Sequence, residues 1–324
     1  MKTIHAIVHA EKPELATIWK AAEIIRAGGL VAFPTETVYG LGADAQNAEA
    51  VAKIYVAKQR PSDNPLIWHA NNLSAFEDVA EFGDKARLLS EAFWPGPLTL
   101  VLPCKIPEKM QPPLKTIAVR VPSHPVTRAL IKASGCIIAA PSANLSGKPS
   151  PTRARHVMKD LNGAIEMILD GGSTSKGLES TVVDLHGDTP RLLRPGAITL
   201  EMLQAVIGKI SVPKASELEG EAPISPGMKY RHYAPHAPVI LVDEGQAHSI
   251  ARDYEADGKS VGILETSKYE SLELAAQDLF DRLRQFDEEG VAIIIVEMVA
   301  EEGIGLAIMN RLRKAASEAD AIVW

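Results

Sequence analysis

The chain of 324 residues is poor in cysteine, in aromatic side chains and in long apolar runs. Its two cysteines, Cys104 and Cys136, sit in apolar surroundings without metal-ligand spacing, which argues against a disulfide framework and a cysteine zinc site. No run approaches the roughly 18 apolar residues that a membrane-spanning helix needs. Residues 1–12 also lack an apolar core of signal-peptide length. We therefore expect a cytoplasmic protein with no membrane partner.

The common signatures of nucleotide-binding and hydrolytic sites are absent as well. We find no Walker lysine motif, no HExxH zinc motif and no serine nucleophile elbow. No glycine fingerprint follows the first expected strand after residue 237, so a dinucleotide site is not predicted there. A catalytic site in this chain must therefore use another arrangement of residues.

The composition that remains is typical of a globular protein long enough for two domains, with 46% hydrophobic and 23% charged residues. The net charge of −7 is unevenly distributed. Residues 1–209 carry 23 basic against 20 acidic side chains, whereas residues 210–324 carry 11 against 21. Because the basic residues of the first part gather near the motifs described below, we expect a small anionic ligand rather than a long nucleic-acid footprint.

The pattern of apolar residues divides the chain into three parts. Residues 1–209 mix strands and helices without strict alternation, which predicts an α/β catalytic domain around a twisted mixed sheet. Residues 210–237 have the proline, glycine and charge content of a linker or lid, and this part ends in PGMKYRHYAP. In residues 238–324 apolar strands alternate with helices, which predicts a small Rossmann-like domain with a parallel sheet.

Individual elements follow from helical spacing and from short apolar runs. We expect helices over 13–27, 48–58, 84–94, 125–133, 200–207, 245–257, 271–288 and 305–318, with one more that Thr152 caps. We expect strands over 30–33, 65–69, 98–102, 117–121, 136–140, 166–170, 180–185, 191–193, 238–242, 260–264, 291–296 and 321–324.

The stretch GGLVAFPTETVYGLGADA, residues 28–45, joins a short apolar run to a polar loop. Open α/β folds bind ligands at loops that follow strands, although an ordinary strand-to-helix turn shows the same sequence pattern. We expect this loop to form one wall of a pocket. Gly40 and Gly42 would then let the backbone pass close to a ligand.

Four hydrogen-bond donors lie close together after the second expected helix. Lys58 and Arg60 are two residues apart, and Asn64 and His69 follow them. Lysine as a point charge and arginine as a planar fork both suit phosphate groups. A solvated helix end and a histidine without a special role would produce the same pattern.

Arginine and hydroxyl groups mark three further segments. Arg120 stands in an apolar strand and needs an anionic partner, either Glu36 or the carboxylate of a ligand. The loop over 141–151 is rich in serine, asparagine and glycine ahead of a helix, which predicts an anion cradle, although many such loops bind nothing. Ser180 opens a strand and Arg194 ends one.

These segments occur in a fixed order that resembles one family. The chain contains PTETVYGLGADA, AKQRPSDNPLIWH, WPGPLTLVL, AVRVPSHP, APSANLSGKPSPT, LESTVVDL, LLRPGAIT, SPGMKYRHYAP and GIGLAIMNRLRKA. Over nearly its whole length it is similar to the long, two-domain form of the YrdC-like threonylcarbamoyl-AMP synthases. Each motif is modest, but their joint order is specific.

The resemblance implies a nucleotidyltransferase that converts L-threonine, bicarbonate and ATP into L-threonylcarbamoyl-AMP and pyrophosphate, the first step toward threonylcarbamoyladenosine in tRNA. By motif position it implies that threonine contacts Thr37, His69, Arg120, Ala140 and Ser180. It implies that ATP contacts Lys58, Arg60, Asn64, Thr116, Ser142, Asn144, Ser150, Arg194 and Tyr233, with Lys58 and Arg60 as catalytic cations that face the phosphates.

The resemblance also implies a cofactor and partners. Mg2+ would arrive with ATP, without a metal site of the protein's own, and a downstream tRNA threonylcarbamoyl transferase would accept the product. Direct contact with tRNA would be weak at most. Because an acyl-adenylate hydrolyses easily, we expect residues 226–235, with Lys229, Arg231 and Tyr233, to fold over the ATP site as a lid.

Two other functions fit parts of the pattern. A double-stranded RNA or tRNA-binding module could use Lys58, Arg60 and Arg120 to grip phosphates, although the acidic total and the missing aromatic platform argue against it. A related carbamoyl-transfer enzyme could act on an amine other than threonine.

Overall fold

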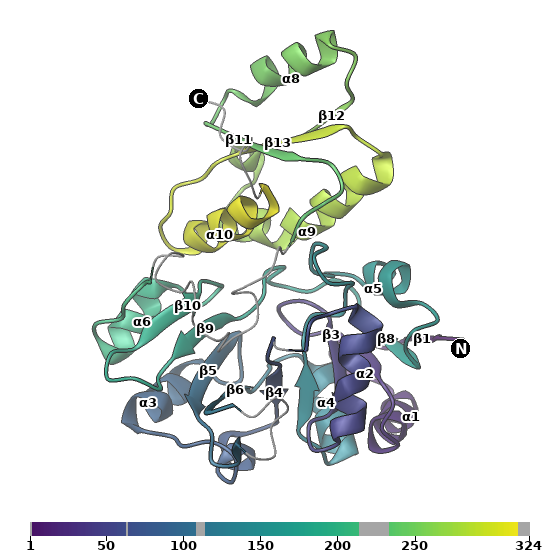
Figure 1. Ribbon diagram of the computed structural model, residues 1–324, viewed down its shortest axis with the longest axis vertical. Coiled ribbons are helices and arrows are strands. Elements are labelled where there is room, and N and C mark those ends of the chain that lie inside the picture. The colour runs from purple at the N-terminus through teal and green to yellow at the C-terminus, as the bar shows by residue number, and fades with distance from the viewer. Residues whose placement is uncertain (1, 63, 108–113, 214–232, 317–324) are drawn as a thin grey trace.

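The computed structural model describes residues 2–62, 64–107, 114–213 and 233–316. Two separate sheets organise them, one large and mixed and one small and parallel (Figure 1). We call residues 4–207 the N-terminal unit and residues 239–316 the C-terminal unit. The expected α/β class, with a mixed sheet followed by a small parallel one, is confirmed. The expected boundaries at residues 209 and 237 stay predictions, and the strand expected over 321–324 lies outside the described residues.

The large sheet has ten strands. They are β1 (Ile4–Ile7), β2 (Val31–Phe33), β3 (Gly40–Asp44), β4 (Ile67–His69), β5 (Leu98–Pro103), β6 (Thr116–Arg120), β7 (Ile138–Ala140), β8 (Met167–Asp170), β9 (Thr181–Asp184) and β10 (Arg191–Arg194). Their spatial order is β1-β8-β2-β3-β7-β4-β6-β5-β9-β10. The sheet contains parallel pairs such as β4 with β6 and antiparallel pairs such as β5 with β6, so it is mixed, as predicted.

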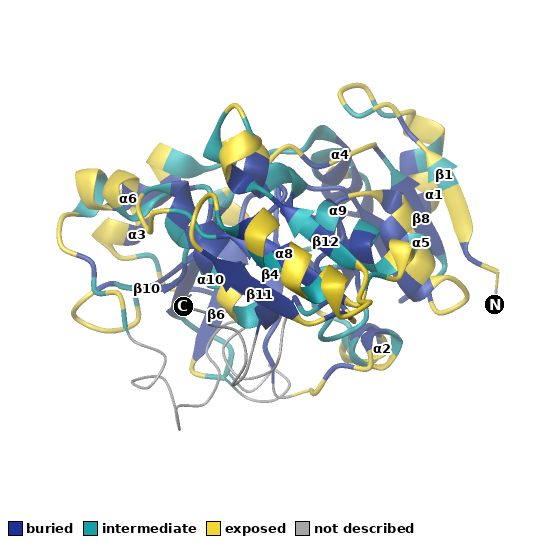
Figure 2. Ribbon diagram, turned by 90° about the horizontal axis from the view of Figure 1, so that it is seen from above, coloured by how far each residue is buried: buried dark blue, intermediate teal, exposed yellow. Residues whose placement is uncertain are grey.

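Helices cover both faces of this sheet. They are α1 (Leu15–Arg26), α2 (Ala48–Lys58), α3 (Asp84–Phe93), α4 (Pro125–Ser134), α5 (Ala154–Leu161) and α6 (Leu200–Ile207), with the 3-10 turn η1 (Leu73–Phe76). Because side chains of a strand alternate between faces, Val31 and Phe33 pack under α1 and α4, whereas Leu30 and Ala32 join the core under α2 and α5. Figure 2 shows the buried strands in dark blue and exposed positions of α2 in yellow.

On the sheet face that carries Phe33, helices no longer contribute to the apolar packing near β4, β6 and β9. There the apolar residues Ile67, Ala118 and Val182 form a small cluster to which only strands contribute. The register of β4 with β6 sets Ile67 beside Ala118 and His69 beside Arg120. The alternation that buries this cluster therefore brings two of the predicted site residues to the same face.

The C-terminal unit shows the regular alternation of strands and helices that the sequence predicts. Its elements are β11 (Val239–Val242), α8 (Ala247–Ala256), β12 (Val261–Leu264), η3 (Thr266–Lys268), α9 (Leu272–Glu289), β13 (Ile293–Glu297) and α10 (Ile304–Ala316). The strands run parallel in the order β11-β13-β12. Helices α9 and α10 lie between this sheet and the N-terminal unit (Figure 1), and their core includes Val38 and Leu178 of that unit. Within the described part of the chain, no helix is both long and apolar enough to cross a bilayer.

Several local expectations need correction. Strands β1 and β3 are not predicted, and Arg153 rather than Thr152 is the N-cap of α5. Gly42 makes room for packing and not for a ligand: a Cβ there would come 2.5 Å from Cε1 of Phe33. Cys104 and Cys136 are unbridged and half-buried rather than fully buried.

Candidate active site

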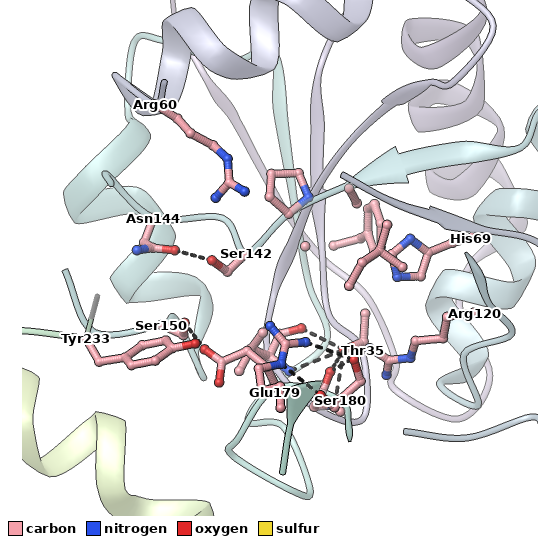
Figure 3. A pocket seen from close by; sticks show the side chains of 18 of the residues that line it. Thr35, Arg60, His69, Arg120, Ser142, Asn144, Ser150, Glu179, Ser180 and Tyr233 are labelled. Atoms are coloured by element: carbon pink, nitrogen blue, oxygen red, sulfur yellow. Dashed lines mark hydrogen bonds between the residues drawn. The ribbon is translucent and has the colours of Figure 1, made fainter. Parts of the chain in front are cut away.

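A cavity opens at the edge of the large sheet that faces the C-terminal unit, and segments far apart in sequence converge on it (Figure 3). Its volume of about 60 Å3 is small beside the roughly 300 Å3 or more of a typical small-molecule site. All but three of the predicted site residues line it, namely Thr37, Arg60, His69, Arg120, Ala140, Ser142, Asn144, Ser150, Ser180, Arg194 and Tyr233.

Arg120 finds the protein partner that the sequence left open. Its Nη2 lies 2.7 Å from Oε1 of Glu36, and both side chains are buried. Its Nη1 donates to Oγ1 of Thr37 at 3.1 Å. Burial opposes ionisation of Glu36, yet the charge and hydrogen bonds of Arg120 keep the pKa of this carboxyl below its ordinary value. The pair therefore keeps both its charges and presents a fixed hydroxyl, Thr37, to the cavity.

His69 is a neutral group in this site. Burial first, and then the nearby charge of Arg120, lower its pKa to about 3. In the neutral ring Nδ1 donates to the carbonyl of Ile138 at 3.3 Å, which leaves Nε2 as an acceptor. At neutral pH, His69 can therefore accept a proton in a hydrogen bond but adds no charge.

The loop over 141–150 forms another wall, and Lys58 holds it in place. Nζ of Lys58 donates to the carbonyl oxygens of Ser142 and Asn144, at 2.5 Å each, and the carbonyl of Lys58 accepts from the amide of Ser146. Burial, with a contribution from Arg60, lowers the pKa of Lys58 well below its usual value. In this structure the amine of Lys58 faces loop carbonyls and Lys58 does not line the cavity, so its assignment to a phosphate stays a prediction.

Asn64 and Thr116 also stand apart from the cavity lining. Asn64 is buried next to the end of α2, where its carbonyl accepts from Arg60. Thr116 begins β6, four residues before Arg120, which corresponds to roughly 13 Å along a strand. Their assignment to a nucleotide stays a prediction.

Hydroxyls and an arginine close the cavity at β9. Oγ of Ser180 accepts from Nη2 of Arg194 at 3.0 Å, and Nε of Arg194 donates to the carbonyl of Ser180 at 3.0 Å. The hydroxyl of Thr99 on the neighbouring β5 lies 2.7 Å from the same Oγ. These bonds fix the orientation of the Arg194 guanidinium, which lines the cavity.

Glu179 is a site residue that our sequence reasoning did not identify. It is buried beside Ser180, accepts a hydrogen bond from Oγ of Ser150, and pairs through its other oxygen with Arg311 of α10 at 2.9 Å. The only local signal is an acidic residue next to Ser180 in the segment LESTVVDL. Thr35 and Lys148 line the cavity as well, and they lie in the two segments, 28–45 and 141–151, that we expected at a ligand without naming these residues.

Tyr233 enters from the side of the C-terminal unit (Figure 3). It is buried, its ring packs 5.3 Å from the ring of Phe280 on α9, and its backbone has a φ of 66°, in the left-handed region. The end of the expected lid thus reaches the cavity. The other lid residues, Lys229 and Arg231, lie outside the described part of the chain.

The burial of the cations argues against the RNA-binding alternative. Lys58, Arg60 and Arg120 have only 1%, 9% and 4% of their surface exposed. Their charges point into the protein, where a rigid duplex cannot follow. This end of the sheet is built to enclose a small molecule.

The chain is similar to known proteins over nearly its whole length. A family model described as telomere recombination matches residues 23–196, and one described as the C-terminal domain of threonylcarbamoyl-AMP synthase matches residues 198–317. The threonylcarbamoyl-AMP synthase of Bacillus subtilis is 50% identical over 94% of this chain and 93% of its own, and that of Pyrococcus abyssi is 48% identical over 92% and 94%.

Comparison with a solved structure shows that the similarity extends to the three-dimensional fold. The crystal structure of P. abyssi Sua5 complexed with L-threonine superposes with a TM-score of 0.92 at 46% identity, covering 97% of this chain and 98% of that one. Similarity of this extent covers both sheets and the segments that line the cavity. The chain therefore belongs to the threonylcarbamoyl-AMP synthase family, in its two-domain form.

Proposed function

We propose that this protein joins L-threonine, bicarbonate and ATP into L-threonylcarbamoyl-AMP and releases pyrophosphate. The observation that carries the proposal is one cavity lined by hydroxyls and by Arg60, Arg120 and Arg194, with Arg120 paired to Glu36. A related protein of the same fold binds L-threonine. The same cavity contains the cationic side chains that binding of a polyphosphate requires.

The reaction needs two bond-forming steps. Bicarbonate takes up a proton and loses water to give CO2. The neutral amine of threonine attacks this CO2 and gives a carbamate, which releases a proton in turn. A carbamate oxygen then attacks the α-phosphorus of ATP, and the bond from that phosphorus to the bridging oxygen of pyrophosphate breaks. Both attacking and leaving groups are anions, so in-line positioning and charge neutralisation matter more than a covalent nucleophile.

The threonine side of the cavity is assigned to Thr37, His69, Arg120, Ala140 and Ser180. A zwitterionic amino acid has no net charge and suits the neutral environment of the pair between Arg120 and Glu36. In this dry surrounding the pKa of the substrate amine falls, which favours the reactive neutral form. His69, itself neutral, offers an acceptor to the amine or the hydroxyl of the substrate.

The nucleotide side is assigned to Arg60, Ser142, Asn144, Ser150, Arg194 and Tyr233, with Asn64 and Thr116 farther out. Arg60 and Arg194 supply charge to the phosphates, and the loop over 141–150 supplies hydroxyls. A cavity of about 60 Å3 holds only part of ATP, so the rest of the nucleotide would lie at its open mouth. Tyr233 lines the cavity and belongs to the proposed lid.

Mg2+ is proposed to enter on the phosphates of ATP. The described residues include no group of three histidine, cysteine or acidic side chains that could hold an ion. The two carboxylates beside the cavity, Glu36 and Glu179, are each engaged by an arginine. This donor set suits a cation ligated mainly by phosphate oxygens and water, where it would offset the charge of pyrophosphate. The protein's own part is to place Arg60 and Arg194 beside those phosphates.

The product is a reactive mixed anhydride, so a second enzyme must accept it quickly. We propose a tRNA threonylcarbamoyl transferase as that acceptor. A direct role for tRNA in this protein is not part of the proposal.

Pyrophosphate release tests the proposal. The purified protein with ATP, Mg2+, bicarbonate and L-threonine should release pyrophosphate, and release should stop when threonine is omitted. Equal release without threonine would end the idea. A panel of other amino acids in the same assay tests the alternative amine substrate, because turnover with another amine at a higher kcat/KM would replace threonine.

A further inference from the structure

One side chain of the C-terminal unit reaches the cavity machinery of the N-terminal unit. Arg311 of α10 is 0% exposed, and among the described residues it is the largest side chain that is fully buried. Its Nε donates to Oε2 of Glu179 at 2.9 Å, and its Nη1 donates to the carbonyl of Pro195 at 2.7 Å. Its guanidinium carbon lies 5.6 Å from the ring centroid of Tyr233.

Glu179 connects this arginine to the nucleotide side of the cavity. Oε1 of Glu179 accepts from the hydroxyl of Ser150, while Oε2 takes the bond from Arg311. Among the described residues, Arg311 makes the one ion pair with this carboxylate. Burial opposes the charge of Glu179, but Arg311 and then Arg194 hold the pKa of the carboxyl below its ordinary value. Glu179 is thus a buried anion in a cavity that must accept a polyanion.

We infer that Arg311 is a positioning residue for ATP: it neutralises Glu179 and fixes the carboxylate that orients Ser150. This inference rests on the proposed function, and it assigns to the C-terminal unit a direct part in nucleotide binding. Without Arg311, the carboxylate loses its ion pair, repels the phosphates in surroundings that screen charge poorly, and competes with them for Arg194. Threonine, which has no net charge, is affected much less.

The test compares substrates in steady-state assays of full-length variants. Arg311→Met should raise the KM for ATP about tenfold to a hundredfold, in keeping with the loss of a charge-assisted contact, while the KM for threonine stays within about twofold. Adding Glu179→Gln removes the stranded charge, so the double variant should recover most of the ATP affinity. Arg313→Met is the matched control, because Arg313 lies on the same helix but pairs with Glu301 at the surface.

Recovery of ATP affinity in the double variant distinguishes a positioning role of Arg311 from a role that only connects the two units. If Arg311 only ties the units together, Glu179→Gln cannot restore ATP affinity, and both KM values change alike; that result overturns the inference. An Arg311→Met protein with the kinetics of Arg313→Met overturns it as well. Should Arg311→Met not fold, Arg311→Gln keeps some hydrogen bonds without the charge and carries the same expectation. If neither neutral variant folds, with or without Glu179→Gln, Arg311 serves the fold alone and the inference is wrong.

Failure of the proposed function is visible separately. In that case wild-type protein shows no threonine-dependent release of pyrophosphate. Calorimetric titration of the same variants with ATP and Mg2+ then still measures whether Arg311→Met weakens nucleotide binding and whether the double variant restores it.

Discussion

At the scale of residues, burial decides which groups of the cavity carry charge. Arg120 and Glu36 stay ionised because each offsets the other, at 2.7 Å. At His69, burial and the charge of Arg120 outweigh the opposing charge of Glu36, and the ring loses its proton. The same sheet face thus holds a permanent ion pair and a neutral imidazole, side by side through the pairing of β4 with β6.

The titration of His69 gives a measurable consequence. An unfolded histidine takes up a proton near pH 6.5, whereas folded His69 does so only near pH 3. Its contribution to stability is therefore complete above pH 6.5 and decreases as the pH falls toward 3, by up to about 1.4 kcal/mol per pH unit. Urea unfolding between pH 8 and 4.5 should show a steeper loss of stability for wild type than for His69→Gln. Parallel curves for the two proteins would show that His69 titrates normally.

Arg60 should matter for the reaction far more than for the fold. Its hydrogen bonds to the carbonyls of Asn64 and Pro65 are long, at 3.3 and 3.4 Å. We expect Arg60→Ala to lower kcat/KM for ATP about a hundredfold, the usual effect of removing a group that stabilises developing charge. The melting temperature should fall by only about 1–4 °C. A folded Arg60→Ala protein with wild-type kcat/KM would remove Arg60 from the catalytic set.

At the scale of elements, the last turn of α2 is the anchor of the cavity loop. The side chain of Lys58 binds two loop carbonyls and its own carbonyl binds the loop amide of Ser146. Inside the loop Asn144 donates to the carbonyls of Leu145 and Lys148, and the bonds of Lys58 tie the loop to α2.

Replacing Lys58 by methionine tests this anchoring. The change leaves two buried carbonyls without their donor, and we expect it to lower the free energy of unfolding by about 2–4 kcal/mol and to weaken ATP binding. The control is Lys53→Met on the same helix: Nζ of Lys53 also donates to a carbonyl, that of Gly28 at 2.7 Å, but the residue is exposed. Chemical denaturation should therefore show a loss of about 1 kcal/mol or less for the control. Equal losses for both variants would contradict the anchoring role.

At the scale of the whole molecule, two ion clusters join α9 to the N-terminal unit. Arg284 binds the carbonyl of Pro149 and pairs with Asp160 at 2.7 Å. Asp281 accepts from Arg153, Arg155 and His156, and Figure 1 shows α9 above the segment that leads into α5. The first cluster includes Pro149, which directly precedes Ser150, and the second includes Arg153, three residues after it.

Acid should weaken this interface through Asp281. Burial opposes its charge, but the hydrogen bonds from His156 and the two arginines keep its pKa far below the usual value. A carboxyl with a lowered pKa stabilises the fold fully above its unfolded value near pH 4 and loses that effect below it. We expect Asp281→Asn to cost about 1–2 kcal/mol at pH 7, with the difference from wild type shrinking below pH 4 in thermal melts. A difference that stays constant to pH 3 would contradict this.

Removal of residues 210–324 tests the dependence between the units. The N-terminal unit keeps its ten-stranded sheet and most of its own core, so we expect it to fold, as circular dichroism can check. It loses Arg311, Arg284 and Tyr233, and it should therefore make the product with a strongly raised KM for ATP. Full activity in the truncated protein would refute the role of the linker and of the C-terminal unit at the cavity.

Much of the fold could be predicted because its elements are encoded locally. Helices α2 and α6 begin and end at the predicted residues, since apolar spacing and N-caps such as Asn47 are local signals. Strand β1 escapes prediction because Ile7 is 79% exposed and the strand exists only through pairing with β8, some 160 residues away. Strand β3 escapes because glycine is a poor strand former, and β2 and β7 flank it only in the folded chain.

The sequence by itself determined the fold class and most of the elements, because periodicity is a property of neighbouring residues. The resemblance of its motifs to one family indicated most of the residues that line the cavity. Only the tertiary structure decided the use of each charge. Lys58 and Arg60 lie two residues apart in one motif, yet Lys58 turns to loop carbonyls while Arg60 faces the cavity. Arg311 and Arg313 are equally close, yet only Arg311 reaches Glu179. A charge acts through its surroundings, and those come from distant parts of the chain.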